Sequence, residues 1–418
     1  MDDIVKIAKD FPKGFYKKVD KKGEYVMNED GTHVMVKKKL DTGELTELLS
    51  DHFKNRLRHD LLKLRIELDN QPIDNSLIAH FYILLSQLGY YVSDKYAQDA
   101  LLWVAQKNNF HPIVEFLEDL ENDDSIEPAD INKISTNYLE TDDPLSDQMM
   151  KCTLVGMVSR VINRGCKFDT CLVLKGDQGI GKSSFWRILA GQDWFCDSWN
   201  ENLKDLYLTI QTCWIFELAE LDNITTKKDA GAIKCLLSSA SDYFRRPYER
   251  ITDIHPRPSI FVGTCNTAHF LTDPSGSRRF QIIDLGNKMI DLDTVKEDRL
   301  RILKAAVIAF RNGEKTYLSS ADQNKSNLNN LAYQQEHPFM SALYNWTERE
   351  AQTAMFVDGF TTRMALIRSD VRSENKITTA DCRAGADCLR QLGYEQSINQ
   401  IKTSNGLKRL WKKNPNID

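Results

Sequence analysis

A glycine-rich segment near the middle of this chain constrains its fold more than any other feature. Residues 176–184 read Gly-Asp-Gln-Gly-Ile-Gly-Lys-Ser-Ser and fit the pattern G-x-x-x-x-G-K-[ST]. The apolar run Cys171–Leu174 precedes the pattern, and a helix-compatible run up to Ala190 follows it. The glycines of such a loop let backbone N–H groups turn inward around an anion, and the following helix presents its positive dipole end to the same anion. The segment therefore predicts a strand, a phosphate-binding loop and a helix of an α/β protein.

The residue types in this loop predict that it binds a nucleoside triphosphate. Lys182 would reach the β- and γ-phosphates, and the Ser183 hydroxyl would hold Mg²⁺, so ATP and Mg²⁺ are the expected cofactors. The alternative is a glycine-rich loop that fits the pattern by chance, and the flanking strand and helix argue against it. The expected cofactor-binding residues are Gly176, Asp177, Gln178, Gly179, Ile180, Gly181, Lys182, Ser183 and Ser184.

Length and composition limit the classes of protein to which the chain can belong. Its 418 residues are too many for one compact core, and 41% hydrophobic with 28% charged residues is ordinary for a globular protein without a membrane span. The formal net charge of −5 excludes a global basic field, so DNA would have to bind at a local basic surface. Nine cysteines without a C-x-x-C pair favour reduced thiols in a cytoplasmic protein over a zinc site.

Changes in the residue pattern divide the chain into four segments. Residues 1–47 predict a small β-containing segment, because Asp30-Gly31 separates two alternating apolar runs as in a hairpin. Residues 48–145 have helical periodicity and predict a helical module. Residues 146–318 alternate strands with helices, which predicts a mainly parallel sheet covered on both faces. Residues 319–418 predict a mostly helical module with a basic end.

Acidic and polar residues follow the next strands of the predicted sheet. Glu217 ends the second strand, Cys213–Phe216, and Glu220 comes three residues later. A carboxylate beside the phosphate loop suits Mg²⁺ coordination, and a second can activate the attacking water. We assign Glu217 to the metal and Glu220 to the water; the reverse assignment, and an exposed loop carboxylate at position 220, stay open. Asn266, after the third strand, is the candidate for contact with the γ-phosphate or the water.

Two adjacent arginines, Arg278 and Arg279, follow a Pro-Ser-Gly turn and precede the fourth strand. In a ring, such a guanidinium can act as an arginine finger that completes the site of the neighbouring subunit. A surface ion pair is the alternative, and which arginine would be the finger stays open. The expected catalytic residues are Lys182, Glu217, Glu220, Asn266, Arg278 and Arg279, and the expected metal ligands are Ser183 and Glu217.

If the chain forms a ring around DNA, as the family resemblance described below implies, the basic residues before the third strand are the expected DNA-binding surface, because such a ring grips the DNA backbone with cationic loops that face its pore. The expected DNA contacts are Arg245, Arg246, Arg250, His255 and Arg257, the last three on a hairpin over residues 250–257 with Arg250 and His255 at its tip. For Arg245 and Arg246 a role at the nucleotide or the subunit interface stays open, and for His255 a place on a solvated loop.

A second basic surface lies near the end of the chain around Trp411. Its cations are Lys402, Lys408, Arg409, Lys412 and Lys413. Two interpretations stay open: a winged-helix-like module that binds DNA, and a solvated tail with one aromatic residue anchored in the core.

Several of these pieces, in this order, resemble the virulence-associated protein E family of phage and genomic-island replication ATPases. That family is similar to superfamily 3 helicases and AAA+ ring ATPases. The resemblance covers roughly residues 109–280. The matching stretches are Asn109–Leu117, Val158–Thr170, the phosphate loop, Glu217–Leu221, Asp242–Tyr248, Val262–Asn266 and Asp273–Phe280.

The resemblance implies an α/β P-loop NTPase core of the AAA+ or superfamily 3 type that assembles as a ring, expected to be a hexamer, and unwinds single-stranded or forked DNA in the cytoplasm of a bacterial host. It also implies a primase–polymerase unit, either upstream or in trans. An upstream unit would make this chain part of a longer protein. The alternatives are a protein remodelling or loading ATPase and a small-molecule phosphotransferase. Arg250 and Arg257 favour DNA over a polypeptide, and Arg278 with Arg279 argues against a phosphotransferase.

Overall fold

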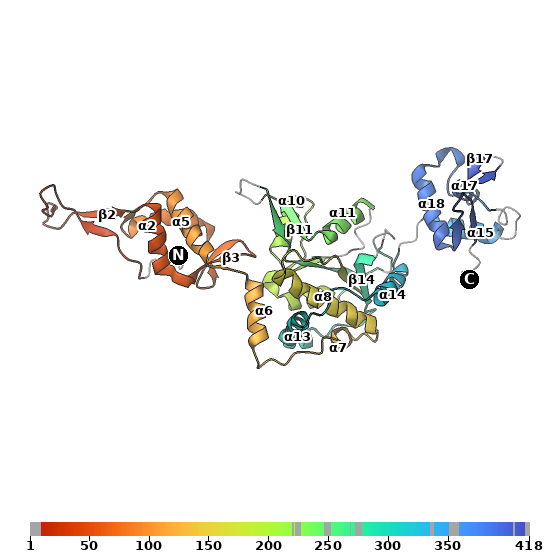
Figure 1. Ribbon diagram of the computed structural model, residues 1–418, viewed down its shortest axis with the longest axis horizontal. Helices are drawn as coiled ribbons and strands as arrows, with labels where there is room; N and C mark the ends of the chain where they lie inside the picture. Colours follow the sequence, from red (N-terminus) through yellow and green to blue (C-terminus); the bar gives the residue numbers. More distant parts are fainter. Residues whose placement is uncertain are drawn as a thin grey trace. The chain divides into compact units, whose positions relative to one another are not determined.

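The computed structural model contains two compact units, formed by residues 1–267 with 275–330 and by residues 268–274 with 331–418 (Figure 1). The residues that it describes are 10–219, 221, 227–245, 252–267, 269–271, 278–334, 338–350, 359–403 and 406–413.

The first unit is built on a five-stranded sheet with the strand order β14–β8–β13–β10–β9. Its strands are β8 Cys171–Lys175, β9 Phe195–Cys196, β10 Ile215–Leu218, β13 Ile260–Cys265 and β14 Phe280–Asp284. Every neighbouring pair in this sheet is parallel. All six residues of β13 are buried, as expected for an apolar strand in the middle of a parallel sheet. The prediction of a mainly parallel α/β sheet is confirmed.

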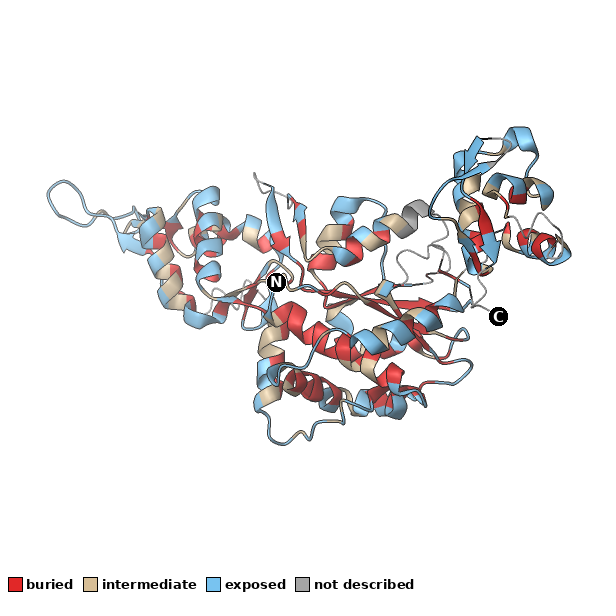
Figure 2. Ribbon diagram, turned by 45° about the vertical axis from the view of Figure 1, so that its right-hand side comes forward, coloured by how far each residue is buried: buried red, intermediate tan, exposed pale blue. Residues whose placement is uncertain are grey.

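Helices α8, α9 and α13 share one hydrophobic core with this sheet. Fifteen of the nineteen residues of α8 are buried, so this helix is almost wholly internal (Figure 2). In the view of Figure 1, α8 and α13 lie below the sheet and α11 lies above it. The helices of this region are α6 Pro112–Asn122, α7 Ile134–Leu139, α8 Pro144–Ile162, α9 Lys182–Ala190, α10 Leu203–Gln211, α11 Lys227–Ser238, α12 Leu292–Glu297, α13 Arg299–Arg311 and α14 Ser320–Leu331.

The N-terminal part of the first unit has a separate core, which includes Leu45, Phe53, Phe81 and Leu101. The hairpin predicted around Asp30-Gly31 is present, because Met27 and His33 form an antiparallel bridge across that turn. The elements of this part are β1 Phe15–Lys17, β2 Met35–Lys39, α2 Thr42–Phe53, β3 Leu57–Asp60, β4 Arg65–Leu68, β5 Gln71–Pro72, α3 Asn75–Ala79, α4 Phe81–Gln87, β6 Tyr90–Tyr91, α5 Asp94–Lys107 and β7 Asn109–Phe110.

The prediction of an all-helical module over residues 48–145 is wrong for the stretch that forms β3 and β4. These strands pair antiparallel within the four-stranded sheet β5–β4–β3–β7. The buried Asp60 carboxylate accepts hydrogen bonds from the N–H groups of Leu62 (2.8 Å) and Lys63 (3.0 Å) and so closes the turn. Leu64 in that turn has a φ of +55°, which a helix does not allow. Leucines at helical spacing therefore lie on a hairpin.

The second unit mixes helices with short strands around its own core. Its elements are α15 Met340–Glu350, α17 Thr362–Arg368, α18 Thr379–Gln391, β15 Tyr394–Gln396, β16 Ile401–Thr403, β17 Gly406–Lys408 and β18 Trp411–Lys413. Trp411 is fully buried, which agrees with the interpretation of the basic end as a tail with one aromatic residue anchored in the core. The same interpretation is wrong about a solvated tail, because Lys408, Lys412 and Lys413 lie on strands. None of the helices in the described parts of the chain is long and apolar enough to cross a membrane.

Candidate functional site

The loop at residues 176–181 connects β8 to α9 at the carboxyl edge of the parallel sheet. The N–H of Gly176 donates to the carbonyl of Cys265 (3.1 Å) after β13, and the N–H of Asp177 donates to the carbonyl of Gly286 (2.8 Å) after β14. A Cβ at position 176 would lie 2.7 Å from that same Gly286 oxygen, so only glycine fits. Gly181, with a φ of +96°, begins α9. The two neighbouring strands thus fix the loop from both sides.

The ammonium group of Lys182 lies within this loop. Its Nζ donates to the carbonyls of Gly176 (2.8 Å) and Asp177 (2.7 Å) and to the Asn266 side-chain oxygen (2.9 Å). The Lys182 residue is only 6% exposed, so its charge is held close to the loop backbone. The structure therefore brings together two predicted site residues, Lys182 and Asn266, that are 84 positions apart.

Glu217 is the buried carboxylate of the candidate site, with 1% exposure. Its Oε1 accepts hydrogen bonds from the hydroxyls of Ser183 (2.7 Å) and Thr264 (2.7 Å). Its Oε2 is also buried and has no hydrogen-bond partner among the described residues. A buried carboxylate oxygen without a donor is costly, and a divalent cation is the partner that such an oxygen favours. The expected metal pair, Ser183 and Glu217, therefore lies together, with one oxygen left for a cation.

The position of Glu217 in its strand differs from the prediction. The expected strand ended at Phe216, whereas β10 runs from Ile215 to Leu218 and includes the carboxylate. Glu217 pairs with Val262 of β13, and its side chain reaches Thr264 two residues further along that strand. This contact of Thr264 with the carboxylate is not among the expected site contacts. Its signal was a polar residue near the end of the strand that neighbours the acidic one.

The remaining predicted residues of this site have different outcomes. Glu220 lies outside the described residues. Gln178, Gly179 and Ser184 of the loop and the start of α9 are exposed, whereas Ile180 is buried with 3% exposure. Among the described residues, no group of three or more His, Cys, Asp or Glu side chains forms a metal site. A cation at Glu217 would thus need ligands from outside the protein, such as phosphate oxygens and water.

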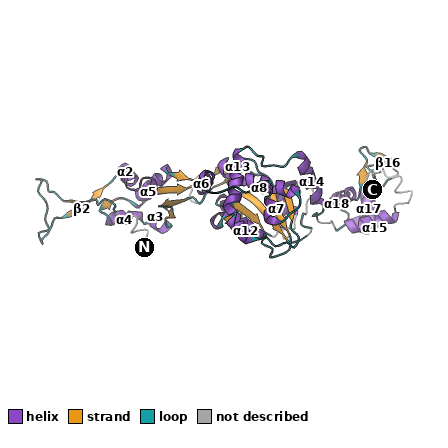
Figure 3. Cartoon of the chain, turned by 90° about the horizontal axis from the view of Figure 1, so that it is seen from below, coloured by secondary structure: helices purple, strands orange, loops and turns teal. Residues whose placement is uncertain are grey.

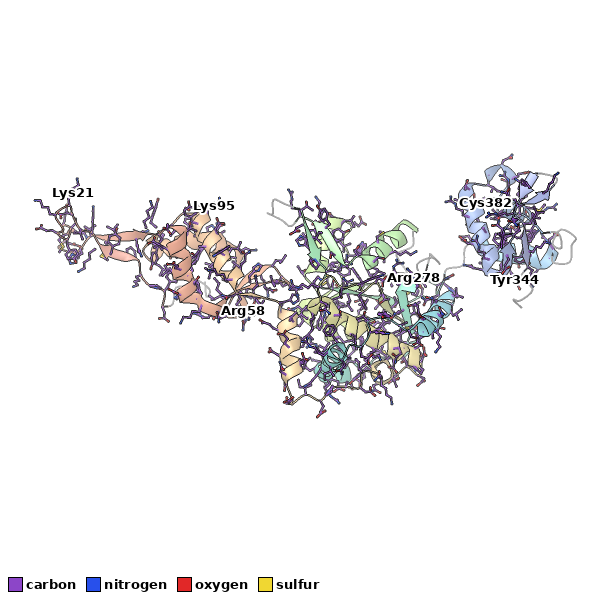
Figure 4. The ribbon with its side chains drawn as sticks, in the orientation of Figure 1. Lys21, Arg58, Lys95, Arg278, Tyr344 and Cys382 are labelled. Atoms are coloured by element: carbon purple, nitrogen blue, oxygen red, sulfur yellow. The ribbon has the colours of Figure 1, made fainter. Side chains whose placement is uncertain are left out.

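Arg278 and Arg279 lie at the opposite edge of the sheet from the loop. They precede β14, whose first residue, Phe280, pairs with Cys171 at the start of β8, whereas the loop follows the end of β8. Five strand residues correspond to about 16 Å, so neither guanidinium approaches the loop of its own chain. Arg278 is exposed beside β14 (Figure 4), and Arg279 donates from Nε to the Ser238 hydroxyl (3.0 Å).

The predicted basic hairpin exists with a different register. Strands β11 Ser241–Phe244 and β12 Asp253–Pro256 pair antiparallel, so the hairpin begins at Ser241 instead of Arg250, and His255 lies on β12 opposite Asp242 instead of at the tip. Arg245 is exposed at the end of β11. Arg246 and Arg250 lie outside the described residues.

The two other predicted DNA contacts are buried at the base of this hairpin. His255 is 7% exposed, and its ring packs on Phe244 with centroids 4.5 Å apart. Arg257 is 0% exposed and forms a two-pronged ion pair with the buried carboxylate of Asp242. The structure therefore does not place either side chain where DNA could reach it. Both side chains are buried because they contact residues of β11, Phe244 and Asp242, and the sequence of the segment itself does not reveal these contacts.

Comparisons with known proteins identify one matching family. A family model described as the virulence-associated protein E-like domain matches residues 117–336. A search of curated proteins found no significant match.

Two solved structures of the NrS-1 C-terminal region in its apo A form are similar to the chain. One is 12% identical, with 71% of this chain and 78% of that chain covered and a TM-score of 0.39. The other, of residues 305–718, is also 12% identical, with 70% and 77% covered and a TM-score of 0.43. At such TM-scores a likeness does not establish a shared fold.

Proposed function

Because the chain belongs to the virulence-associated protein E-like family, we propose that it is an ATP-driven DNA helicase or translocase of a phage-type replication module. In this proposal the parallel sheet is a P-loop NTPase core of the AAA+ or superfamily 3 type, and ATP binds at residues 176–184. The observation that carries the proposal is the cluster at the carboxyl edge of the sheet. There Lys182 contacts Asn266, and Ser183 contacts Glu217.

The site residues divide the work of phosphoryl transfer, which depends mainly on positioning and charge neutralisation. Lys182 would neutralise charge on the terminal phosphates, and Asn266 would orient the attacking water. Bound Mg²⁺ neutralises charge on the phosphate oxygens, and Ser183 with the unpaired Oε2 of Glu217 would hold it. Thr264 fixes the orientation of the Glu217 carboxylate through Oε1. Glu220 stays the candidate for water activation.

Arg278 or Arg279 would act on the nucleotide of a neighbouring subunit. The β8–β14 register separates both arginines from the loop of their own chain by the length of a strand, which supports a role between subunits. A ring, expected to be hexameric, would place each pair of arginines beside the next loop. The guanidinium would then stabilise negative charge in the transition state.

The tip of the β11–β12 hairpin is the proposed DNA contact in the ring. Arg245 is exposed there, and Arg246 and Arg250 belong to the same connecting segment. Cations on a loop can follow a phosphate backbone without reading its sequence. A primase–polymerase unit, upstream or in trans, would use the unwound strand in the cytoplasm of a bacterial host.

One observation favours a second candidate function, a protein remodelling ATPase. Tyr243 and Ile254 are opposite each other on the two hairpin strands and are 69% and 61% exposed. An exposed aromatic–aliphatic pair can grip a polypeptide, whereas the neighbouring Arg245 suits a nucleic acid. The two functions therefore differ in which hairpin side chain matters.

ATP turnover, measured with and without a single-stranded oligonucleotide, tests both candidates. We expect Lys182→Ala to abolish turnover, and the exposed Lys204→Ala in α10 to leave it unchanged. Single-stranded DNA should stimulate turnover, Arg245→Ala should remove that stimulation, and an unfolded polypeptide should have no effect. Stimulation by the polypeptide that depends on Tyr243 would instead support remodelling, and full turnover by Lys182→Ala would exclude the site.

Subunit mixing tests the arginine role. Subunits with Arg278→Ala and Arg279→Ala keep an intact loop, and Lys182→Ala subunits keep intact arginines. Mixed in one assembly, they should recover part of the turnover that each lacks alone. Recovery at no mixing ratio would assign the site to a single chain.

A further inference from the structure

The second unit has the element order of a winged helix. Among the described residues, helix α15 precedes an isolated antiparallel bridge at Phe360, and then come α17, α18, β15, the β16–β17 hairpin and β18 (Figure 3). Phe360 and Trp411 exchange two backbone hydrogen bonds, of 3.2 Å and 2.8 Å. Trp411 is also paired with Gln396 of β15 on its other side. Strand β18 therefore pairs with β15 on one side and with the bridge at Phe360 on the other, and residues 397–403 with 406–410 are here called the wing.

An aromatic core fixes this wing and α18 to the rest of the unit. The ring of Phe360 contacts those of Trp346 and Tyr394 with centroids 4.9 Å and 5.5 Å apart. The buried Trp411 donates from Nε1 to the Thr362 hydroxyl (2.8 Å) at the start of α17. A Cβ added to Gly385 would lie 2.9 Å from the Leu366 side chain, so α17 and α18 pack closely where α18 has a glycine. The unit thus has a rigid base from which α18 and the wing present their outer faces.

The part of this unit between residues 338 and 413 is basic, although the whole chain is acidic. Residues 338–413 include twelve Lys or Arg and eight Asp or Glu, a balance of +4, whereas the chain has a net charge of −5. Between Tyr394 and Lys413, Glu395 is the only acidic residue. The cations of this stretch are all exposed and are Lys402, Lys408, Arg409, Lys412 and Lys413.

Helix α18 extends the basic surface. Arg383, Asp387 and Arg390 are exposed at helical spacing on one face of it. Arg390 pairs with Asp387 (2.6 Å), and its guanidinium lies 5.4 Å from the centroid of the Trp411 ring. This contact places the C-terminal end of α18 against the strand that carries Lys412 and Lys413, so helix and wing form one surface.

We propose that this surface binds double-stranded DNA, with α18 directed to the major groove and the wing cations to the phosphate backbone. An α-helix fits the major groove of B-DNA, and Arg383 is an exposed donor on that helix. The surface lacks what a single strand needs, because the only aromatic residues between Thr379 and Lys413 are Tyr394 and Trp411, both buried. The exposed apolar residues of the described part of the wing, Ile398, Ile401 and Leu407, are aliphatic. This site does not depend on ATP hydrolysis.

Binding of the full chain to a short fluorescent duplex, and to one of its strands alone, tests the proposal. We expect Lys402→Glu with Lys408→Glu to weaken duplex binding at least tenfold and to reduce the slope of log affinity against log salt by about 2, one for each lost phosphate contact. Single-strand-stimulated ATP turnover should not change. The matched control, Lys95→Glu with Lys107→Glu, alters the same net charge on exposed positions of α5 and should bind duplex as the unmodified chain does.

Three results would overturn the proposal: duplex affinity of the wing variant equal to that of the control, preference of the unmodified chain for the single strand, and no duplex binding at all. The last would leave the wing to a protein partner. Arg383→Ala is a second, milder variant that changes no core residue and should weaken duplex binding severalfold. Thermal unfolding followed by circular dichroism confirms that the variants stay folded.

Discussion

Arg257 and Arg245 are both basic residues of the β11–β12 region, yet the structure predicts opposite consequences when each is replaced by alanine. Arg257 is fully buried and satisfies Asp242 through two nitrogens, and its third donates to the Leu236 carbonyl. Arg245 is exposed at the end of β11. Arg257→Ala should therefore lower the free energy of unfolding, whereas Arg245→Ala should change only contacts with a ligand.

The size of the destabilisation by Arg257→Ala depends on the buried Asp242 carboxylate, which loses its ion-pair partner. Without the guanidinium, the 1%-exposed carboxylate of Asp242 keeps one donor, the Gln211 side-chain amide at 3.0 Å. Removing one partner of a buried ion pair costs about 3–5 kcal/mol. At about 2–4 °C per kcal/mol for a domain of this size, the melting temperature should fall by roughly 6–20 °C. Arg245→Ala should stay within about 0.5 kcal/mol of the unmodified protein.

Thermal unfolding followed by circular dichroism, together with a double-mutant cycle, checks this reasoning. Asp242→Ala combined with Arg257→Ala should cost less than the sum of the two single replacements, because no charge is left buried alone. Arg257→Lys keeps the charge but lacks the fork and should fall between alanine and arginine. An Arg257→Ala protein that melts like the unmodified one but loses DNA binding would refute the assignment and return Arg257 to the DNA surface.

Two further predictions concern the site and the pH dependence of stability. Thr264→Val keeps the shape of the side chain but removes its hydrogen bond to the buried Glu217 carboxylate, so ATP turnover should fall about tenfold to a hundredfold and the melting temperature should also decrease. Burial, with a smaller effect from Arg164, lowers the pKa of His111 from 6.5 to about 4. The unfolded chain then binds the proton first, so stability is complete above pH 6.5 and decreases by about 3 kcal/mol as the pH falls toward 4. His111→Leu should flatten unfolding free energies measured between those pH values, and an unchanged slope would contradict the assignment.

Local patterns predicted the elements whose cause is local. The loop before Lys182 depends on glycines within six residues and leads directly into α9, so both follow from one short stretch of sequence. Strand β10 begins and ends two residues later than the expected strand Cys213–Phe216, because the apolar run starts two residues before the pairing with β13. The helical prediction for Leu57–Ile66 is wrong, because leucines at helical spacing also suit a hairpin whose turn is fixed by Asp60.

Contacts between distant residues were harder to predict. Thr264 reaches Glu217 only because β13 and β10 are neighbours, an order that the sequence does not state. Arg257 was taken for a surface cation because its partners, Gln211 and Asp242, come from other elements. Lys182 and Asn266, by contrast, were both placed at strand ends of one sheet edge, which sufficed to bring them together.

The parallel pairing of β8 with β14 has a consequence for how activity should scale with concentration. With the loop on one rim of the sheet and the two guanidinium groups on the other, each chain offers half of two different reaction centres under the proposed mechanism. An open row of subunits would then contain one complete centre fewer than its number of chains, and a closed ring would contain as many centres as chains. ATP turnover per chain should consequently rise steeply with protein concentration. Isolated chains should have no turnover, and turnover per chain should become constant once rings close.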